Sequence, residues 1–375
     1  MRMKKIMILA VAAIALAACS KTYDNTPVAQ SQIGFNTWAE TLTKARTQGS
    51  STFASGDDFA VYGYKDKSDD SDPQTVFGHD GTNDVVVSTT DGTTWDYTTP
   101  RYWDSNYDKY IFYAISPSAV GLAGSVNPQT GAITSAAISF SGKNNDILVA
   151  DKKQVDKGSA PYFNNYAIVP LVFNHVASLV DFKVKKTHGL ADATVTVTAF
   201  ELSDIDSQGQ LTVSSAYTGT HPVASWTDPG TARSTYGPAD GVESVTLGSG
   251  IAIAEDTAFN PASPATPAAA TDIIKKLVVM PQTFRASGGT NPQKITLTYK
   301  IAIANTADVE YKDCVVYLNQ FDVENDDYNS TATNFTGWEP GKHYTFYITL
   351  DAHKINFSAT ITDWTNVSGY NYLLN

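Results

Sequence analysis

The stretch Ala193-Thr-Val-Thr-Val-Thr-Ala-Phe200 decides the fold class, because small apolar residues alternate in it with threonines. A period of two places successive side chains on opposite faces of a β-strand, so one face of this segment is apolar. Further segments that alternate in this way, or run apolar for a few residues, recur at residues 59–64, 109–115, 294–303 and 343–350. Apolar residues spaced three and four apart, as an amphipathic helix needs, are almost absent. The sequence therefore predicts an all-β protein.

Turn-forming residues separate these segments. Clusters rich in Gly, Pro, Asn and Asp lie at residues 65–73, 90–93, 127–131 and 337–341. Short strands joined by such turns favour antiparallel β-sandwiches, in which each sheet has one solvated face. Residues 226–241 and 256–271 contain prolines and are expected to be long surface loops. The polar stretch at residues 151–166 predicts a domain boundary near residue 167.

The first 18 residues have the composition of a secretory signal. Arg2, Lys4 and Lys5 precede an apolar run at residues 6–18, which is shorter than the roughly 20 residues of a membrane-spanning helix. The run ends at Leu16-Ala-Ala-Cys19, which is similar to a bacterial lipobox. A lipobox cysteine is acylated and becomes the N-terminal residue, and its acyl chains hold the protein on a membrane. The alternative is an ordinary signal with an incidental cysteine.

Cysteine content and charge limit the function classes further. The chain has two cysteines, so a lipid on Cys19 leaves Cys314 alone and excludes a disulfide framework. We interpret Cys314 as a small strand residue rather than a catalytic thiol. The formal net charge is −12 and becomes −15 when the three basic residues of the signal are removed. A negative charge of this size opposes binding to nucleic acid, so no nucleic-acid partner is expected.

Enzyme motifs are missing from the sequence. It contains neither the His-Glu-x-x-His of metalloproteases nor the Gly-x-Ser-x-Gly of serine hydrolases. The six histidines form no closely spaced pair of the kind that binds zinc, and His175 on an apolar strand is interpreted as a packed side chain. The acidic stretches 66–72 and 322–327 lack the glycine and glutamate of a calcium loop. We therefore expect no catalytic residue, no cofactor and no metal.

The order of the strand segments resembles that of the fimbrillin, or Mfa-like, family of lipoprotein pilins that build type V fimbriae. The matching pieces, in the order of the family, are residues 33–35, 43–46 with 58–64, 102–103 with 109–117, 145–150, 170–177, 277–282, 338–344 and 355–364. Each piece alone is unspecific, but together they follow a lipobox and span about residues 33–364.

This resemblance implies a domain organisation. The fold expected is all-β, with two transthyretin-like antiparallel β-sandwich domains in tandem. We expect a lipoprotein signal peptide at residues 1–18 and a propeptide with the first strand at residues 19–46. An N-terminal domain at residues 47–166 and a C-terminal domain at residues 167–375 follow.

The resemblance also implies a route of assembly. In the family, an arginine-specific protease removes the lipidated N-terminal segment with its first strand, and a strand of the next subunit fills the vacated groove. Here the cut would fall between Arg46 and Thr47, and the displaced strand would carry Ile33 and Phe35. A solvated loop cation is the alternative for Arg46. Arg285 has equally permissive flanks, but a cut there would sever the second domain.

The candidate donor strand lies in the tail, where Tyr370, Tyr372 and Leu374 alternate. Such a strand suits donation to a neighbour or docking on its own domain. The expected function is that of a non-enzymatic subunit of surface fimbriae, which is held at the outer membrane by lipid before processing and then supports adhesion. Its expected partners are other pilin subunits, the protease, and a host receptor or glycan.

A surface lipoprotein that binds a glycan or another ligand is the alternative function. Its motivation is a group of aromatic residues whose rings would stack on sugars if they were exposed. The group consists of Trp95, Tyr97, Tyr102 and Trp103.

Overall fold

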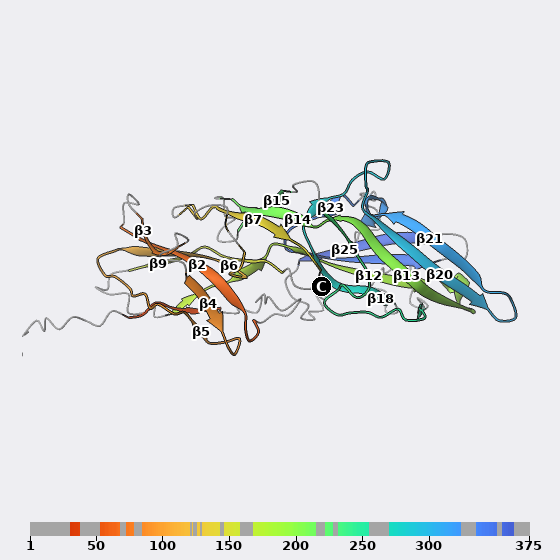
Figure 1. The fold of residues 1–375 in the computed structure, drawn as a ribbon, viewed down its shortest axis with the longest axis horizontal. Helices are drawn as coiled ribbons and strands as arrows, with labels where there is room; N and C mark the ends of the chain where they lie inside the picture. The colour runs from red at the N-terminus through yellow and green to blue at the C-terminus, as the bar shows by residue number, and fades with distance from the viewer. Residues whose placement is uncertain are drawn as a thin grey trace, which may run out of the picture. The chain divides into compact units, whose positions relative to one another are not determined.

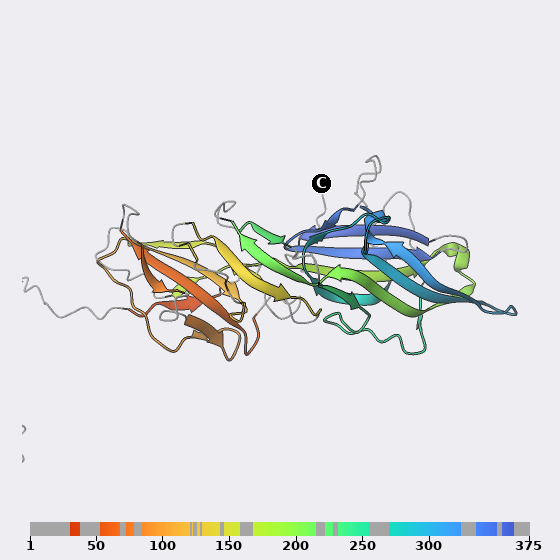
Figure 2. The ribbon, with the colours of Figure 1, turned by 45° about the horizontal axis from the view of Figure 1, so that its top comes forward.

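The computed structural model describes residues 31–37, 53–67, 73–78, 85–120, 122, 126–127, 130–142, 146–157, 168–214, 222–227, 232–254, 270–323, 335–350 and 355–363. Within these ranges the chain is built almost wholly of β-strands (Figures 1 and 2). The helices described are two single 3-10 turns, η1 (His188–Leu190) and η2 (Leu318–Gln320). No helix in these ranges is long and apolar enough to cross a membrane. The predicted all-β, mainly antiparallel fold class is confirmed.

An eight-stranded antiparallel sheet forms the centre of the first half of the described chain. Its main path runs β11-β8-β6-β2-β4-β5, while β3 pairs with β2 and β9 with β6. The bounds are β2 Asp58–Asp66, β3 Gln74–Phe77, β4 Val85–Thr89, β5 Trp95–Asp96, β6 Lys109–Ser116, β8 Leu148–Ala150, β9 Lys153–Asp156 and β11 Phe173–His175. All of β6 after Lys109 is buried, as expected for a central strand with a continuous apolar run.

Both faces of this sheet carry apolar side chains, and each face packs against other strands. One face shares a core with β1 (Gly34–Asn36) and β10 (Ile168–Pro170). The other face shares a core with Leu211 and Val213 of β14 (Gln208–Val213). β14 lies between β7 (Ile133–Ser139) and β15 (Ala224–Thr227) in a three-stranded sheet. The domain boundary near residue 167 stays a prediction.

Two further sheets face each other across a separate core. One runs β18-β12-β24-β25-β22 and the other β16-β13-β20-β21, with β17 paired to β13. Figures 1 and 2 show β13, β20 and β21 side by side. The bounds are β12 Ser178–Lys186, β13 Ala193–Asp206, β16 Arg233–Tyr236, β17 Ile251–Ala252, β18 Thr271–Val279, β20 Lys294–Ile303, β21 Val309–Tyr317, β22 Asp322–Val323, β24 Lys342–Leu350 and β25 Ile355–Asp363. β19 (Gln282–Thr283) pairs with β23 (Gly337–Trp338).

The segment at residues 193–200 lies in β13, and its alternation is interrupted. Ala193, Val195 and Val197 are buried as expected. A register shift between Val197 and Ala199 marks a β-bulge, after which Phe200 rather than Ala199 is buried. An extra residue in one strand of a pair reverses the faces of all residues that follow it, which explains the change.

Two expectations about local structure are corrected. Residues 226–241 were expected to be one long loop, but they contain β16. Tyr236 of this strand is buried, and its hydroxyl donates a hydrogen bond to the Phe140 carbonyl at 3.2 Å. Three strand pairs are parallel rather than antiparallel: β1 with β10, β12 with β24, and β22 with β25.

Buried tyrosines give the fold a pH dependence. Burial raises the pKa of Tyr236 to about 12, and burial likewise raises the pKa of Tyr344 to about 12. The Tyr344 hydroxyl accepts a hydrogen bond from the Glu339 N–H at 2.7 Å. An unfolded tyrosine loses its proton near pH 10, so the folded chain binds more protons than the unfolded chain between about pH 10 and 12.

We therefore expect the free energy of unfolding to fall as the pH rises from 10 to 12, by up to about 1.4 kcal/mol per pH unit for each such group. Urea unfolding at pH 9, 10 and 11 measures this slope. Tyr344→Phe should flatten it. Tyr102→Phe, which removes a hydroxyl from a side chain that is 49% exposed, is the control. An unchanged slope in Tyr344→Phe would contradict the assignment.

Candidate functional site

The first strand, β1, is hydrogen-bonded on both of its edges. On one edge it runs parallel to β10, with Gly34 opposite Ile168 and Phe35 opposite Val169. Just beyond this pairing, the Leu171 N–H donates a hydrogen bond to the Asn36 carbonyl at 2.8 Å.

The opposite edge of the same segment meets residues 101–103. The Ile33 N–H donates to the Arg101 carbonyl at 2.8 Å, and the Trp103 N–H donates to the Ser31 carbonyl at 3.1 Å. Residues 31–37 thus lie as an inner strand between two neighbours. We call residues 31–37 and the groups that hold them the β1 site.

The inward side chains of β1 complete an aromatic core. Ile33 is fully buried and Phe35 is 5% exposed. The ring of Phe35 meets four aromatic rings edge-on, with centroid distances of 5.3 to 6.1 Å. These rings belong to Phe59, Phe77, Tyr97 and Phe112. Burying Ile and Phe side chains contributes about 1.5–3 kcal/mol each, so the two anchor β1 to the sheet.

A glycine in β2, on the sheet against which β1 packs, makes room for two of these rings. A Cβ on Gly63 of β2 would lie 2.7 Å from the Phe77 ring and 3.1 Å from the Phe112 ring. Glycine within a strand often marks a close approach by another group. Gly63, inside the apolar segment at residues 59–64, is therefore the sequence feature that indicates a close approach of other side chains to β2.

Two polar contacts fix the position of β1 along the sheet. The Tyr97 hydroxyl donates a hydrogen bond to the Ile33 carbonyl at 2.5 Å, and the Trp95 indole Nε1–H donates to the Thr37 hydroxyl at 3.0 Å. Burial raises the pKa of Tyr97, so its hydroxyl keeps the proton that it donates. Each such hydrogen bond contributes about 0.5–1.5 kcal/mol net.

The predicted site residues are only partly within the described chain. Ile33 and Phe35 lie together in the β1 site. The remaining predicted residues lie outside the described ranges: Cys19, Arg46, Thr47, Tyr370, Tyr372 and Leu374. Of the aromatic group that motivated a glycan-binding function, Trp95, Tyr97 and Trp103 are buried in the core. Their rings are therefore not available to stack on a sugar.

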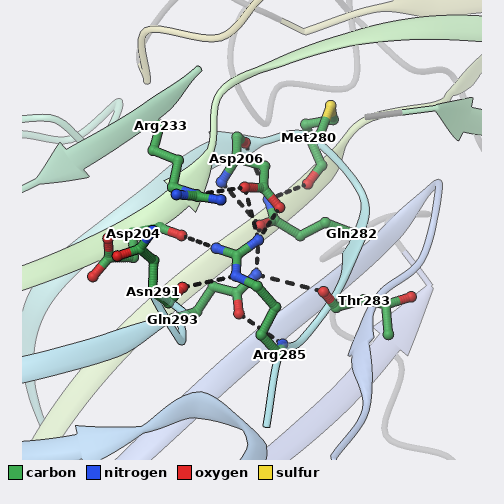
Figure 3. Close-up of polar contacts among 9 residues, drawn as sticks. All are labelled: Asp204, Asp206, Arg233, Met280, Gln282, Thr283, Arg285, Asn291 and Gln293. Atoms are coloured by element: carbon green, nitrogen blue, oxygen red, sulfur yellow. Dashed lines mark hydrogen bonds and ion pairs between the residues drawn. The ribbon is translucent and has the colours of Figure 1, made fainter. Parts of the chain in front are cut away.

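Arg285 is held by a network of polar contacts (Figure 3). Its Nη1 contacts both carboxylate oxygens of Asp206, at 2.8 and 2.6 Å. Its Nη2 donates to the Asp204 carbonyl at 2.5 Å, and its Nε donates to the Asn291 carbonyl at 2.7 Å. Hydrogen bonds between an ionised guanidinium and a carboxylate are among the stronger hydrogen bonds in proteins. The Arg285 side chain is therefore fixed in one position.

Buried glutamines extend this network around the ion pair. The Gln293 side-chain oxygen accepts from the Arg285 backbone N–H at 2.9 Å, and its Nε2 donates to Gln282 Oε1 at 3.1 Å. Gln282 Oε1 also accepts from the Asp206 backbone N–H at 3.0 Å. Figure 3 shows the amide groups of both glutamines beside the Asp206–Arg285 pair. The backbone N–H of Arg285 is thus held in place together with its side chain.

The two other arginines in the described ranges also have partners. Arg233 Nε contacts the Asp206 carboxylate at 3.4 Å, and Arg101 Nε donates to the Val76 carbonyl at 3.2 Å. A protease must draw an arginine and its flanking backbone into an extended conformation, which these contacts oppose.

The His175 and Cys314 side chains are packed within the fold rather than exposed for a reaction. His175 is buried, and its Nδ1 lies 2.8 Å from the Asp146 carboxylate. Cys314 is half-buried on β21, and burial raises the pKa of its thiol, so the thiol keeps its proton at neutral pH. Within the ranges described, no group of three or more His, Cys, Asp or Glu side chains is placed to hold a metal ion.

The sequence profile of fimbrillin-like proteins matches residues 43–364. The chain belongs to the fimbrillin-like family. This match begins after β1 and ends before the tail that contains Tyr370. Membership supports a pilin-type adhesion subunit, a structural protein that assembles with other pilin subunits in a fimbria at the cell surface.

The solved structures that resemble this fimbrillin include two fimbrial proteins. A fimbrial protein from Bacteroides vulgatus is 16% identical, with a TM-score of 0.56, and the likeness covers 89% of this chain and 99% of that one. A fimbrilin from Porphyromonas gingivalis is 12% identical, with a TM-score of 0.41, over 91% of this chain and 99% of that one. Among functionally curated proteins, none matches the chain. At 16% identity, the likeness to the Bacteroides protein supports the fold alone.

The packing of Phe35 predicts a large effect of its truncation. Phe35→Ala in the uncleaved fimbrillin should lower the free energy of unfolding by about 3–5 kcal/mol, because it leaves a cavity between four rings. Urea unfolding measures the loss. Val86→Ala, at a side chain that is 50% exposed on β4, should change stability by less than about 0.5 kcal/mol. Equal effects of the two substitutions would contradict the anchoring role of Phe35.

The network around Asp206 predicts resistance to proteolysis at Arg285. Asp206→Asn removes the carboxylate that pairs with Arg285, so local opening becomes easier and an arginine-specific protease should cut after Arg285 at least about tenfold faster. Mass spectrometry of fragments that begin at Ala286 measures the rate. Glu310→Gln makes the same chemical change at a glutamate paired with lysines on β20 and β21, and should leave the rate unchanged. Equal rates in both variants would contradict the protection.

Proposed function

We propose that this fimbrillin is exported as a lipoprotein precursor on Cys19, is cut between Arg46 and Thr47, and polymerises by strand exchange. The observation that carries the proposal is the β1 site, where residues 31–37 complete an aromatic core. These residues lie between Cys19 and Arg46 in the sequence. A single cut therefore releases the lipid and makes the first strand a separate piece, held by non-covalent contacts alone.

Loss of β1 would leave a site that another strand can fill. The backbone groups of residues 101–103 and of β10 would lose their partners, and the rings around Phe35 would be exposed to water. An incoming extended strand restores both kinds of contact, since its main chain pairs with the two edges and its alternate side chains enter the core. An empty site of this kind has a strong tendency to capture a strand.

Two arguments support Arg46 as the residue of cleavage. The segment Thr43-Lys-Ala-Arg-Thr-Gln-Gly is polar and contains a glycine, a composition that suits the extended backbone that a protease binds. Arg101, Arg233 and Arg285 each have a guanidinium that contacts an oxygen of another residue. A protease that cuts the folded precursor is thereby directed away from these three arginines.

The proposed donor is the segment that contains Tyr370, Tyr372 and Leu374. The preceding strand, β25, pairs antiparallel with β24 from Ile355 to Asp363 and is occupied within its own sheet. The alternating residues after position 363 are thus the part of this region that we assign to donation. A precursor at the outer membrane then becomes a subunit of a surface fimbria, with a host receptor or glycan as its adhesion target.

Cleavage is tested on purified precursor with an arginine-specific protease. We expect a product that begins at Thr47, followed by ladders of polymer that resist SDS. Arg46→Lys should abolish both the product and the ladder, because it changes the charge-bearing group without altering the strand. A precursor that stays uncut and monomeric, or an Arg46→Lys variant that still polymerises, would overturn the processing step.

Donation is tested separately by deleting residues 365–375. The shortened chain should still be cut after Arg46 but should form no polymer, because it can receive a strand without offering one. N-terminal sequencing confirms the cut, and gel ladders report polymerisation. Polymers that form at the normal rate from the shortened chain would exclude the tail as donor.

A further inference from the structure

The outward face of the β1 site carries two exposed apolar side chains. Tyr102 is 49% exposed and Ile168 is 55% exposed. Tyr102 forms an antiparallel bridge with Gln32, and Ile168 lies opposite Gly34 in the parallel pair of β1 and β10. Residues opposite each other on paired strands point to the same face, so both side chains lie on the face to which Gln32 and Gly34 belong.

Burial along the two flanking segments agrees with this assignment. Trp103 and Val169, the next residues after Tyr102 and Ile168, are buried on the core side with Ile33 and Phe35. Alternation therefore places Tyr102 and Ile168 on the opposite, outer side of β1.

Gly34 leaves a gap between these two side chains. Neighbouring strands lie about 4.7–4.9 Å apart, so a side chain at position 34 would lie directly beside Ile168. A diagonal neighbour two residues away lies within reach of a long side chain, which places Tyr102 in range as well. Because residue 34 is glycine, the chain's own first strand places no side chain opposite Ile168, and the residue that it places opposite Tyr102 is the polar Gln32.

We infer that Tyr102 and Ile168 form a contact surface for the strand that replaces β1, and that its occupant is Tyr372-Leu-Leu374 of a second copy of this chain. This inference rests on the proposed strand exchange. When Tyr372 and Leu374 take the inward positions of Ile33 and Phe35, Leu373 takes the position of Gly34. The middle residue keeps this place whether the strand enters parallel or antiparallel to β10.

The same surface selects one register of the incoming strand. In the alternative register, Tyr370 and Tyr372 point inward and Asn371 takes the position of Gly34. A shift by two residues keeps the inward face apolar, so the core alone discriminates weakly between the two registers. At position 34, Leu373 buries apolar surface against Ile168, whereas Asn371 would place an amide there.

This contact favours replacement of β1 by the donor strand over the reverse exchange. On the outer face, the first strand of the precursor places Gln32 opposite Tyr102 but no side chain opposite Ile168, whereas the donor places Leu373 there. The donor is favoured over the strand that it displaces, and the displaced strand has no side chain with which to compete at position 34.

The surface is tested first without any exchange, in the uncleaved precursor. Gly34→Leu should raise the folding equilibrium constant about fivefold more than Gly34→Ala. Both substitutions restrict the backbone of the unfolded chain, but the alanine side chain is too short to contact Tyr102 and Ile168. Urea unfolding measures both. The excess should disappear when Tyr102→Ala and Ile168→Ala are also present. No excess of Gly34→Leu over Gly34→Ala would overturn the contact surface.

The occupant is tested in polymers of the cleaved, full-length chain. Leu373→Ala polymers should dissociate about fivefold faster than wild-type polymers, and Asn371→Ala polymers should not. The effect of Leu373→Ala should vanish when every copy also carries Tyr102→Ala and Ile168→Ala. If Leu373→Ala polymers dissociate at the wild-type rate, the inference is overturned and the proposed function stays intact. A wild-type chain that is cut but never polymerises would overturn the proposed function and this occupant together, whereas the Gly34 variants would still decide the surface.

Discussion

A sheet with apolar side chains on both faces must be covered on both faces, and the first half of the described chain is organised around this requirement. The central strand β6 is buried on both sides, so neither face of its sheet tolerates water. The β7, β14 and β15 strands pack on one face, and β1 with β10 on the other. β1 is the part of this cover that we propose to be exchanged.

Periodicity predicted the strands well because it reports which side of a strand is apolar. It also placed Ile33 and Phe35 correctly on one face, since burial follows their alternation. Periodicity does not report which strand lies beside which, so the parallel pairing of β12 with β24 had no local signal. The bulge before Phe200 was hidden for a related reason, because a single unpaired residue depends on the partner strand.

The candidate site was only half visible in the sequence because its other half comes from distant residues. Phe35 meets Phe77 and Phe112 through strand pairing, and no spacing in the sequence brings these rings together. Arg285 has flanks as permissive as those of Arg46, yet Asp206, 79 positions away, holds its side chain. Contacts between residues this far apart depend on the register of whole strands, which composition and local pattern do not specify.

Hydrogen bonds on both edges of residues 31–37 also have a mechanical consequence. In the strand exchange that we propose, tension along the axis of a strand seated there acts on both of its edges at once. The bonds to residues 101–103 and to β10 are then sheared together, rather than opened one after another from an end. Removal of the strand by such a force requires these hydrogen bonds to break together. The strand therefore resists a pull along its axis better than a pull that opens the bonds one at a time from an end.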